Sequence, residues 1–62
     1  MNESTLCAVK SICQMEHGGN IEYIESKLGI PNGQLPKYLD TLMNRGDIKS
    51  YDVYGPFFRC SV

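Results

Sequence analysis

The chain has 62 residues, of which 42% are hydrophobic and 21% are charged, and its formal net charge is −1. A chain of this length folds as one domain, residues 1–62, and the composition is typical of a globular protein rather than a disordered one. It contains no apolar run near the roughly 20 residues of a membrane span and no charged leader, so we expect a cytoplasmic protein with no membrane partner.

The first predicted helix covers about residues 5–17, after a frayed end at residues 1–3. Apolar residues recur there with helical spacing and form one buried stripe. The stripe consists of Leu6, Val9, Ile12, Cys13 and Met15. Asn2 or Ser4 can cap the start of this helix, and we expect a glycine after His17 to end it in the left-handed conformation.

A second, shorter helix is predicted over about residues 21–28, with Asn20 as its cap. Its apolar stripe consists of Ile21, Ile24 and Leu28. Glu25 stands beside this stripe, where helix-turn-helix units usually carry a small residue, so we expect a looser contact with the next helix. A turn through Pro31, Asn32 and Gly33 follows.

The third predicted helix covers about residues 34–45 and becomes regular only at Pro36, because proline disfavours helical geometry in the residue before it. Its buried stripe consists of Leu35, Leu39 and Leu42. The opposite face presents Gly33, Pro36, Lys37, Asp40, Thr41 and Asn44. Gly46 ends the helix.

After Gly46 the apolar pattern changes to the alternation of strands, which predicts a β-hairpin over about residues 47–62. Phe58, Cys60 and Val62 share the face that we expect to pack on the core. Two strands alone are marginally stable, so we expect the hairpin to rest on the helices, with Ile21 as a candidate third strand.

This order of elements resembles the winged-helix superfamily, and the resemblance extends from Leu6 to Val62. It rests on the motifs L-G-I-P, L-x-x-x-L-x-x-L and R-G-D-I and on the Gly-Pro turn of the hairpin. The resemblance implies an α+β fold in which a three-helix helix-turn-helix core is followed by a C-terminal β-hairpin wing. The layout is similar to that of small bacterial or phage transcriptional regulators, and also to that of Z-form nucleic-acid-binding domains.

The Z-form-binding family contacts phosphates through an Asn and a Tyr on the third helix and a Trp in the wing. The matching positions here hold Pro36, Asp40 and Phe58. Proline cannot donate the hydrogen bond of an asparagine, and an aspartate repels phosphate. The resemblance therefore carries over for the fold but not for this recognition chemistry.

For a regulator that places its third helix in the major groove of double-stranded DNA, polar side chains on that helix would meet base edges, and cations around it would meet phosphates. The candidates for base edges are Gln34, Lys37, Thr41 and Asn44, and those for phosphates are Arg45, Lys49, Arg59 and Lys27. Because Asp40 shares this face, we expect weak binding by one copy alone, with a homodimer or a partner protein supplying the rest.

The alternative is a winged helix that has lost nucleic-acid binding and acts as a protein-protein interaction module. Tyr54 and Phe57 at the wing turn are its candidate contact residues. We do not expect an enzyme, because the chain lacks a nucleophile-base pair, paired carboxylates and a phosphate-binding glycine loop. Three cysteines without a CxxC pair and a lone histidine predict neither a metal site nor a cofactor.

Overall fold

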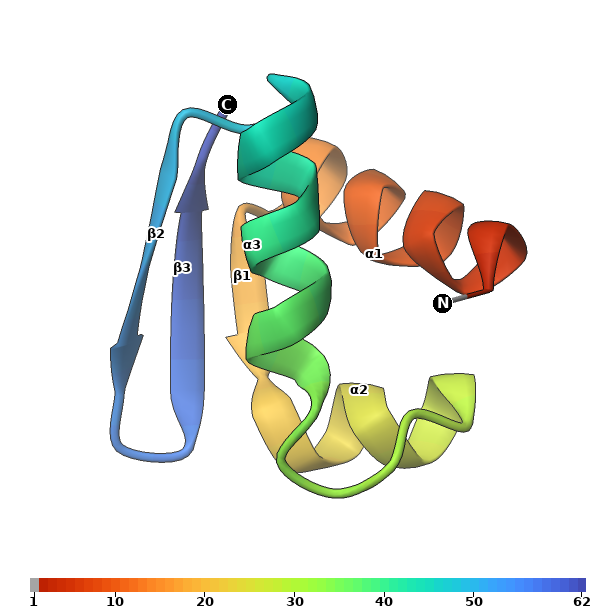
Figure 1. Cartoon of the computed structure of the whole chain (residues 1–62). Coiled ribbons are helices and arrows are strands. Elements are labelled where there is room, and N and C mark those ends of the chain that lie inside the picture. The colour runs from red at the N-terminus through yellow and green to blue at the C-terminus, as the bar shows by residue number, and fades with distance from the viewer. Residues whose placement is uncertain (1) are drawn as a thin grey trace.

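The computed structural model describes residues 2–62 of the chain. Three helices and a three-stranded antiparallel sheet form an α+β fold, as the sequence pattern predicts. The helices are α1 (Glu3–Glu16), α2 (Ile21–Leu28) and α3 (Leu35–Arg45), and the strands are β1 (Gly18–Asn20), β2 (Ser50–Tyr54) and β3 (Phe57–Ser61). In Figure 1, α3 runs alongside the sheet, α1 crosses behind α3, and α2 lies toward the end where β2 turns into β3. No helix within residues 2–62 has the length and apolarity of a membrane span.

Helix α1 begins at Glu3, earlier than the predicted residue 5. The side-chain oxygen of Asn2 accepts hydrogen bonds from the backbone N–H groups of Ser4 at 2.8 Å and Thr5 at 3.4 Å. This confirms Asn2 as the cap, while Ser4 lies inside the helix. The prediction that Glu3 belongs to a frayed end is wrong, and Met1 lies outside the described residues.

The end of α1 also differs from the prediction. His17 takes the left-handed conformation with φ of 61°, and its backbone N–H bonds to the carbonyls of Ile12 and Cys13. Gly18 instead opens β1 against β3, where a Cβ atom would lie 2.1 Å from the carbonyl oxygen of Phe58. The glycine is therefore needed for the close approach of two strands, and not for the end of the helix.

The strand order in the sheet is β1-β3-β2, so β3 is the central strand. Strands β2 and β3 form the predicted hairpin, in register from Ser50 opposite Ser61 to Tyr54 opposite Phe57. The third strand is β1 rather than Ile21, which begins α2. The N–H of Ile21 nevertheless bonds to the carbonyl of Pro56 at 2.8 Å, and this bond ties the hairpin turn to the start of α2.

The core lies between the helices and one face of the sheet. Its buried residues are Leu6, Val9, Cys13, Ile24, Ile30, Leu35, Leu39, Leu42, Ile48, Phe58 and Cys60. Phe58 and Cys60 are buried as predicted, whereas Met15 of the predicted stripe on α1 is 81% exposed and Val62 is 44% exposed. The prediction for Val62 fails because β3 ends at Ser61 and the pairing that holds the strand to the core ends with it.

Candidate nucleic-acid interface

Helix α3 starts at Leu35, inside the predicted range of 34–45 and one residue before Pro36. Gln34 precedes it without making a side-chain cap, and Pro36 has no N–H to cap. The free N–H of Leu35 donates instead to the Glu25 carboxylate of α2 at 3.0 Å. Glu25 is only 3% exposed, so α2 fixes the position of the first turn of α3 through a buried hydrogen bond.

Leu35, Leu39 and Leu42 are buried, and they turn the opposite side of α3 outward. We call that side the polar stripe and define it as Gln34, Lys37, Thr41 and Asn44, which follow one another at intervals of three and four residues. Lys37 and Asn44 are exposed, and Gln34 and Thr41 are half-buried. The structure thus places Lys37, Thr41 and Asn44 on one face of α3, with Gln34 directly before the helix.

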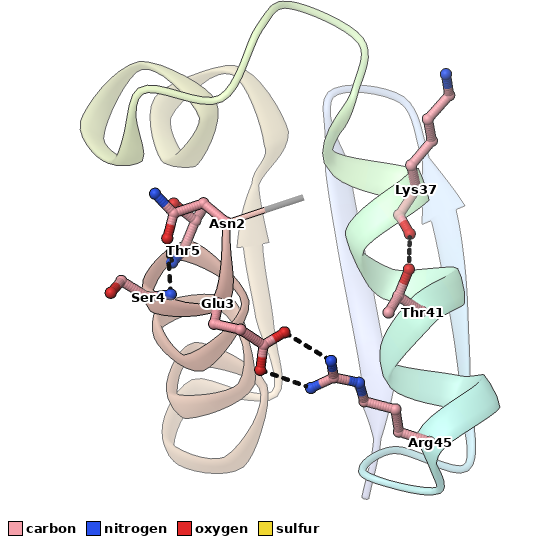
Figure 2. A network of polar contacts seen from close by, with 7 residues as sticks. All are labelled: Asn2, Glu3, Ser4, Thr5, Lys37, Thr41 and Arg45. Carbon is pink, nitrogen blue, oxygen red and sulfur yellow. Dashed lines mark hydrogen bonds and ion pairs between the residues drawn. The ribbon is translucent and has the colours of Figure 1, made fainter.

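Within the stripe, the hydroxyl of Thr41 donates to the backbone carbonyl of Lys37 at 3.0 Å. The donor of Thr41 is therefore occupied, while its oxygen can still accept and its methyl group can still make apolar contact. Figure 2 shows the Lys37 side chain extending outward toward the N-terminal end of α3. Among residues 2–62, no ion-pair partner of Lys37 is found.

One border of the stripe is formed by an ion pair between α3 and α1. The guanidinium of Arg45 donates to both carboxylate oxygens of Glu3, at 3.2 and 2.6 Å (Figure 2). These hydrogen bonds hold the pKa of the Glu3 carboxyl below its usual value and raise the pKa of Arg45. The sequence predicts that Arg45 contacts phosphate, whereas in this arrangement its charge is already matched by the Glu3 carboxylate.

The other border is formed by a contact between α3 and β2. The hydroxyl of Tyr51 donates to the Asp40 carboxylate at 2.7 Å. This hydrogen bond, together with burial and the negative charge of Asp40, raises the pKa of Tyr51 to about 12. The aspartate is exposed and charged beside the stripe, so it reduces the attraction of this face for phosphate.

The remaining predicted phosphate contacts do not join the polar stripe. Arg59 alternates along β3 with the buried Phe58 and Cys60, so it lies on the sheet face turned away from the helices. Lys49 is exposed beyond the C-terminal end of α3, where its N–H pairs with the carbonyl of Ser61. Lys27 is exposed on α2, with its Nζ 5.7 Å from the centroid of the Tyr23 ring.

The two residues predicted for protein contact are exposed and adjacent. Tyr54 and Phe57 face each other across the hairpin, and their ring centroids are 6.0 Å apart. They flank the turn that Pro56 ties to α2. No pocket opens in the surface formed by residues 2–62, so both candidate sites are exposed surfaces.

Glu3 and Tyr51 shape the candidate interface, and the sequence pattern does not single out either one for that role. Each acts on α3 from a distant part of the chain, 42 residues away for Glu3 and 11 for Tyr51. The hydrophobic periodicity of a short segment cannot reveal contacts between residues that are distant in the chain.

Comparisons of the chain with protein-family models, curated proteins and solved structures found no match.

Proposed function

We propose that the chain is a small winged-helix DNA-binding protein, a transcriptional regulator that lays the polar stripe of α3 in the major groove. The observation that carries the proposal is the outward-facing stripe of Lys37 and Asn44, which the rest of the described chain leaves exposed beside a β-hairpin. The major groove is wide enough for one α-helix, and lysine and asparagine are side chains that bond to the edges of guanine and adenine.

The charges around the stripe favour low affinity for one copy of the chain. Arg45 is paired with Glu3, Asp40 adds a negative charge, and Lys37 is the cation of the stripe itself. Each phosphate neutralised changes the slope of log K against log salt by about 0.9. We therefore expect a slope near −1 to −2 per copy, and a homodimer or a partner protein would add the phosphate contacts needed for tight binding.

Charge reversal at one position tests this proposal. Lys37→Glu should weaken binding to a fluorescent duplex roughly tenfold at low salt and lower the salt slope by about one. Lys27→Glu makes the same change in net charge on α2, at a phosphate candidate that the structure leaves outside the stripe, and should change the affinity less than about twofold. Equal losses in both variants would indicate attraction by net charge alone and would remove α3 from the proposal.

The second candidate function is a protein-protein interaction module, favoured by the exposed pair of Tyr54 and Phe57. Aromatic side chains are enriched at the centres of protein interfaces. A module of this kind would leave every duplex unretarded at low ionic strength, and Phe57→Ala would disrupt its protein complex.

Z-form binding is the weaker nucleic-acid alternative. Asp40 bonds to Tyr51, and Phe58 is 1% exposed, so neither offers a phosphate contact of the kind this family uses. We expect the chain to leave the circular dichroism of an alternating GC duplex uninverted, and inversion would favour this alternative.

A further inference from the structure

Two of the three cysteines meet in the core, although they are 47 residues apart in the chain. Cys13 lies on α1 and Cys60 on β3, both are buried, and their Sγ atoms are 2.6 Å apart. Cys7 is exposed on α1 and does not share a helix face with Cys13. The sequence pattern places Cys13 and Cys60 separately at core-facing positions, and the fold brings them into contact.

Backbone contacts hold the two thiols in place independently of their side chains. The N–H of Cys60 donates to the carbonyl of His17 at 2.7 Å, directly after the end of α1. Cys60 is also paired with Tyr51 across the hairpin. The end of α1 and the centre of the sheet are therefore fixed to each other at the point where the thiols meet.

The shared hydrogen bond makes the two sulfurs chemically unequal. The side-chain hydrogen bond with Cys60 lowers the pKa of the Cys13 thiol against the opposing effect of burial. The same bond, burial and the nearby sulfur raise the pKa of Cys60. Cys13 is thus the first to become a thiolate, which is the nucleophilic form of cysteine.

We propose that Cys13 and Cys60 form a dithiol site that is oxidised by hydrogen peroxide to a disulfide linking α1 to β3. The Cys13 thiolate attacks one peroxide oxygen, the O–O bond breaks, and a sulfenic acid forms as the released hydroxide takes up a proton to give water. The Cys60 sulfur then attacks the Cys13 sulfur, the S–O bond breaks, and a second water leaves with the Cys60 proton. Two thiols lose two electrons, and one peroxide is reduced to two waters.

The test uses the full chain with Cys7→Ser, so that only the two buried thiols remain. After one equivalent of hydrogen peroxide, we expect the intact mass to fall by two hydrogens and thiol titration to find no free thiols. Digestion without reductant should yield a peptide pair linked through residues 13 and 60, and a dithiol reductant should separate it. A gain of oxygen without this link, or a disulfide between two chains, would overturn the proposal.

A second measurement separates the effect of the fold from the general reactivity of thiols. In one glutathione redox buffer, the ratio of linked to reduced chain should be at least about tenfold higher for the native Cys7→Ser chain than for the same chain in urea. An equal or lower ratio in the native chain would show that the fold does not favour the bond. Adding Cys60→Ser should stop the reaction at a sulfenic acid on Cys13, which dimedone traps. Circular dichroism first establishes that this variant is folded.

Discussion

The carboxylate of Glu25 on α2 accepts a hydrogen bond from the first backbone N–H of α3, that of Leu35, at 3.0 Å in the protein interior. The first N–H groups of a helix have no partner within the helix, and a side chain at the helix's own N-cap normally accepts a hydrogen bond from one of them. Gln34 makes no such hydrogen bond here, and the accepting side chain is Glu25 of the preceding helix, α2. The placement of the polar stripe therefore depends on a residue that lies outside the stripe.

Glu25→Ala should lower the free energy of unfolding by about 1–3 kcal/mol, because it leaves the buried N–H of Leu35 without a partner. Glu25→Gln keeps one accepting oxygen and should cost less. Glu16→Ala removes an exposed carboxylate at the end of α1 and should stay within about 0.5 kcal/mol of the parent chain. Urea unfolding measures all three, and a Glu25→Ala loss no larger than that of Glu16→Ala would contradict the capping role.

Successive side chains of β3 point to opposite faces of the sheet, so substitutions at the neighbouring residues Phe57 and Phe58 should change the free energy of unfolding by different amounts. Phe58 is 1% exposed and Phe57 is 42% exposed. Phe58→Leu should cost about 1–2 kcal/mol through imperfect repacking of the core, while Phe57→Leu should stay within about 0.5 kcal/mol. Thermal or urea unfolding of the pair tests the register of the sheet, and equal losses would refute it.

The sequence correctly predicts the helices, caps and hairpin that depend on interactions between neighbouring residues. Leu35, Leu39 and Leu42 show the period of a helix with one buried face, and Asn20 is the cap that the pattern indicates, accepting from the N–H of Tyr23 at 2.9 Å. The alternation after Gly46 likewise predicts the hairpin. Each of these features can be read from a few neighbouring residues.

Contacts between distant segments cannot be read in this way. Glu25 stands out in the sequence as a bulky residue expected to loosen the helix pair, because nothing nearby indicates that its carboxylate meets the N–H of Leu35. The pairing of Arg45 with Glu3 depends on how α1 crosses α3. The contact of Cys13 with Cys60 depends on how α1 meets the sheet. These contacts between distant residues determine which charged groups are paired and which thiols meet. The sequence therefore predicts the residues of the polar stripe better than it predicts the ion pairs and hydrogen bonds around the stripe.

The hydrogen bond between Tyr51 and Asp40 predicts that the Tyr51 hydroxyl loses its proton at a higher pH than an ordinary tyrosine does. Its pKa in the folded chain is raised to about 12 from a usual value of 10.0. The stabilisation from this bond is therefore fully present below pH 10 and is lost as the pH rises through 10 toward 12. Asp40→Ala should return the pKa of Tyr51 toward its usual value, as measured by NMR of carbon-labelled tyrosine.

Asp52→Ala is the matched control for that titration. Asp52 is exposed and lies next to Tyr51 on β2, but successive side chains of a strand point to opposite faces. Its removal should leave the pKa of Tyr51 near 12. If both aspartate variants shift the titration equally, the cause is general charge and not the hydrogen bond to Asp40.

Release of Arg45 from Glu3 should strengthen DNA binding under the proposed function. Glu3→Gln removes the carboxylate charge that pairs with Arg45 while leaving the polar stripe unchanged. We expect tighter binding at low salt and a salt slope steeper by about one, with little change in stability, since exposed ion pairs contribute little. Glu16→Gln makes the same change in net charge at the opposite end of α1 from Glu3. If the two variants bind duplex equally well, Arg45 does not contact phosphate.

The most direct measurement of the central claim, that the polar stripe of α3 meets DNA, is a chemical-shift titration of the chain with random-sequence duplex at low ionic strength. The predicted result is a set of perturbed amides at Lys37, Thr41 and Asn44 that recovers as salt is added. Perturbations confined to Tyr54 and Phe57, or none at any duplex concentration, would contradict the claim.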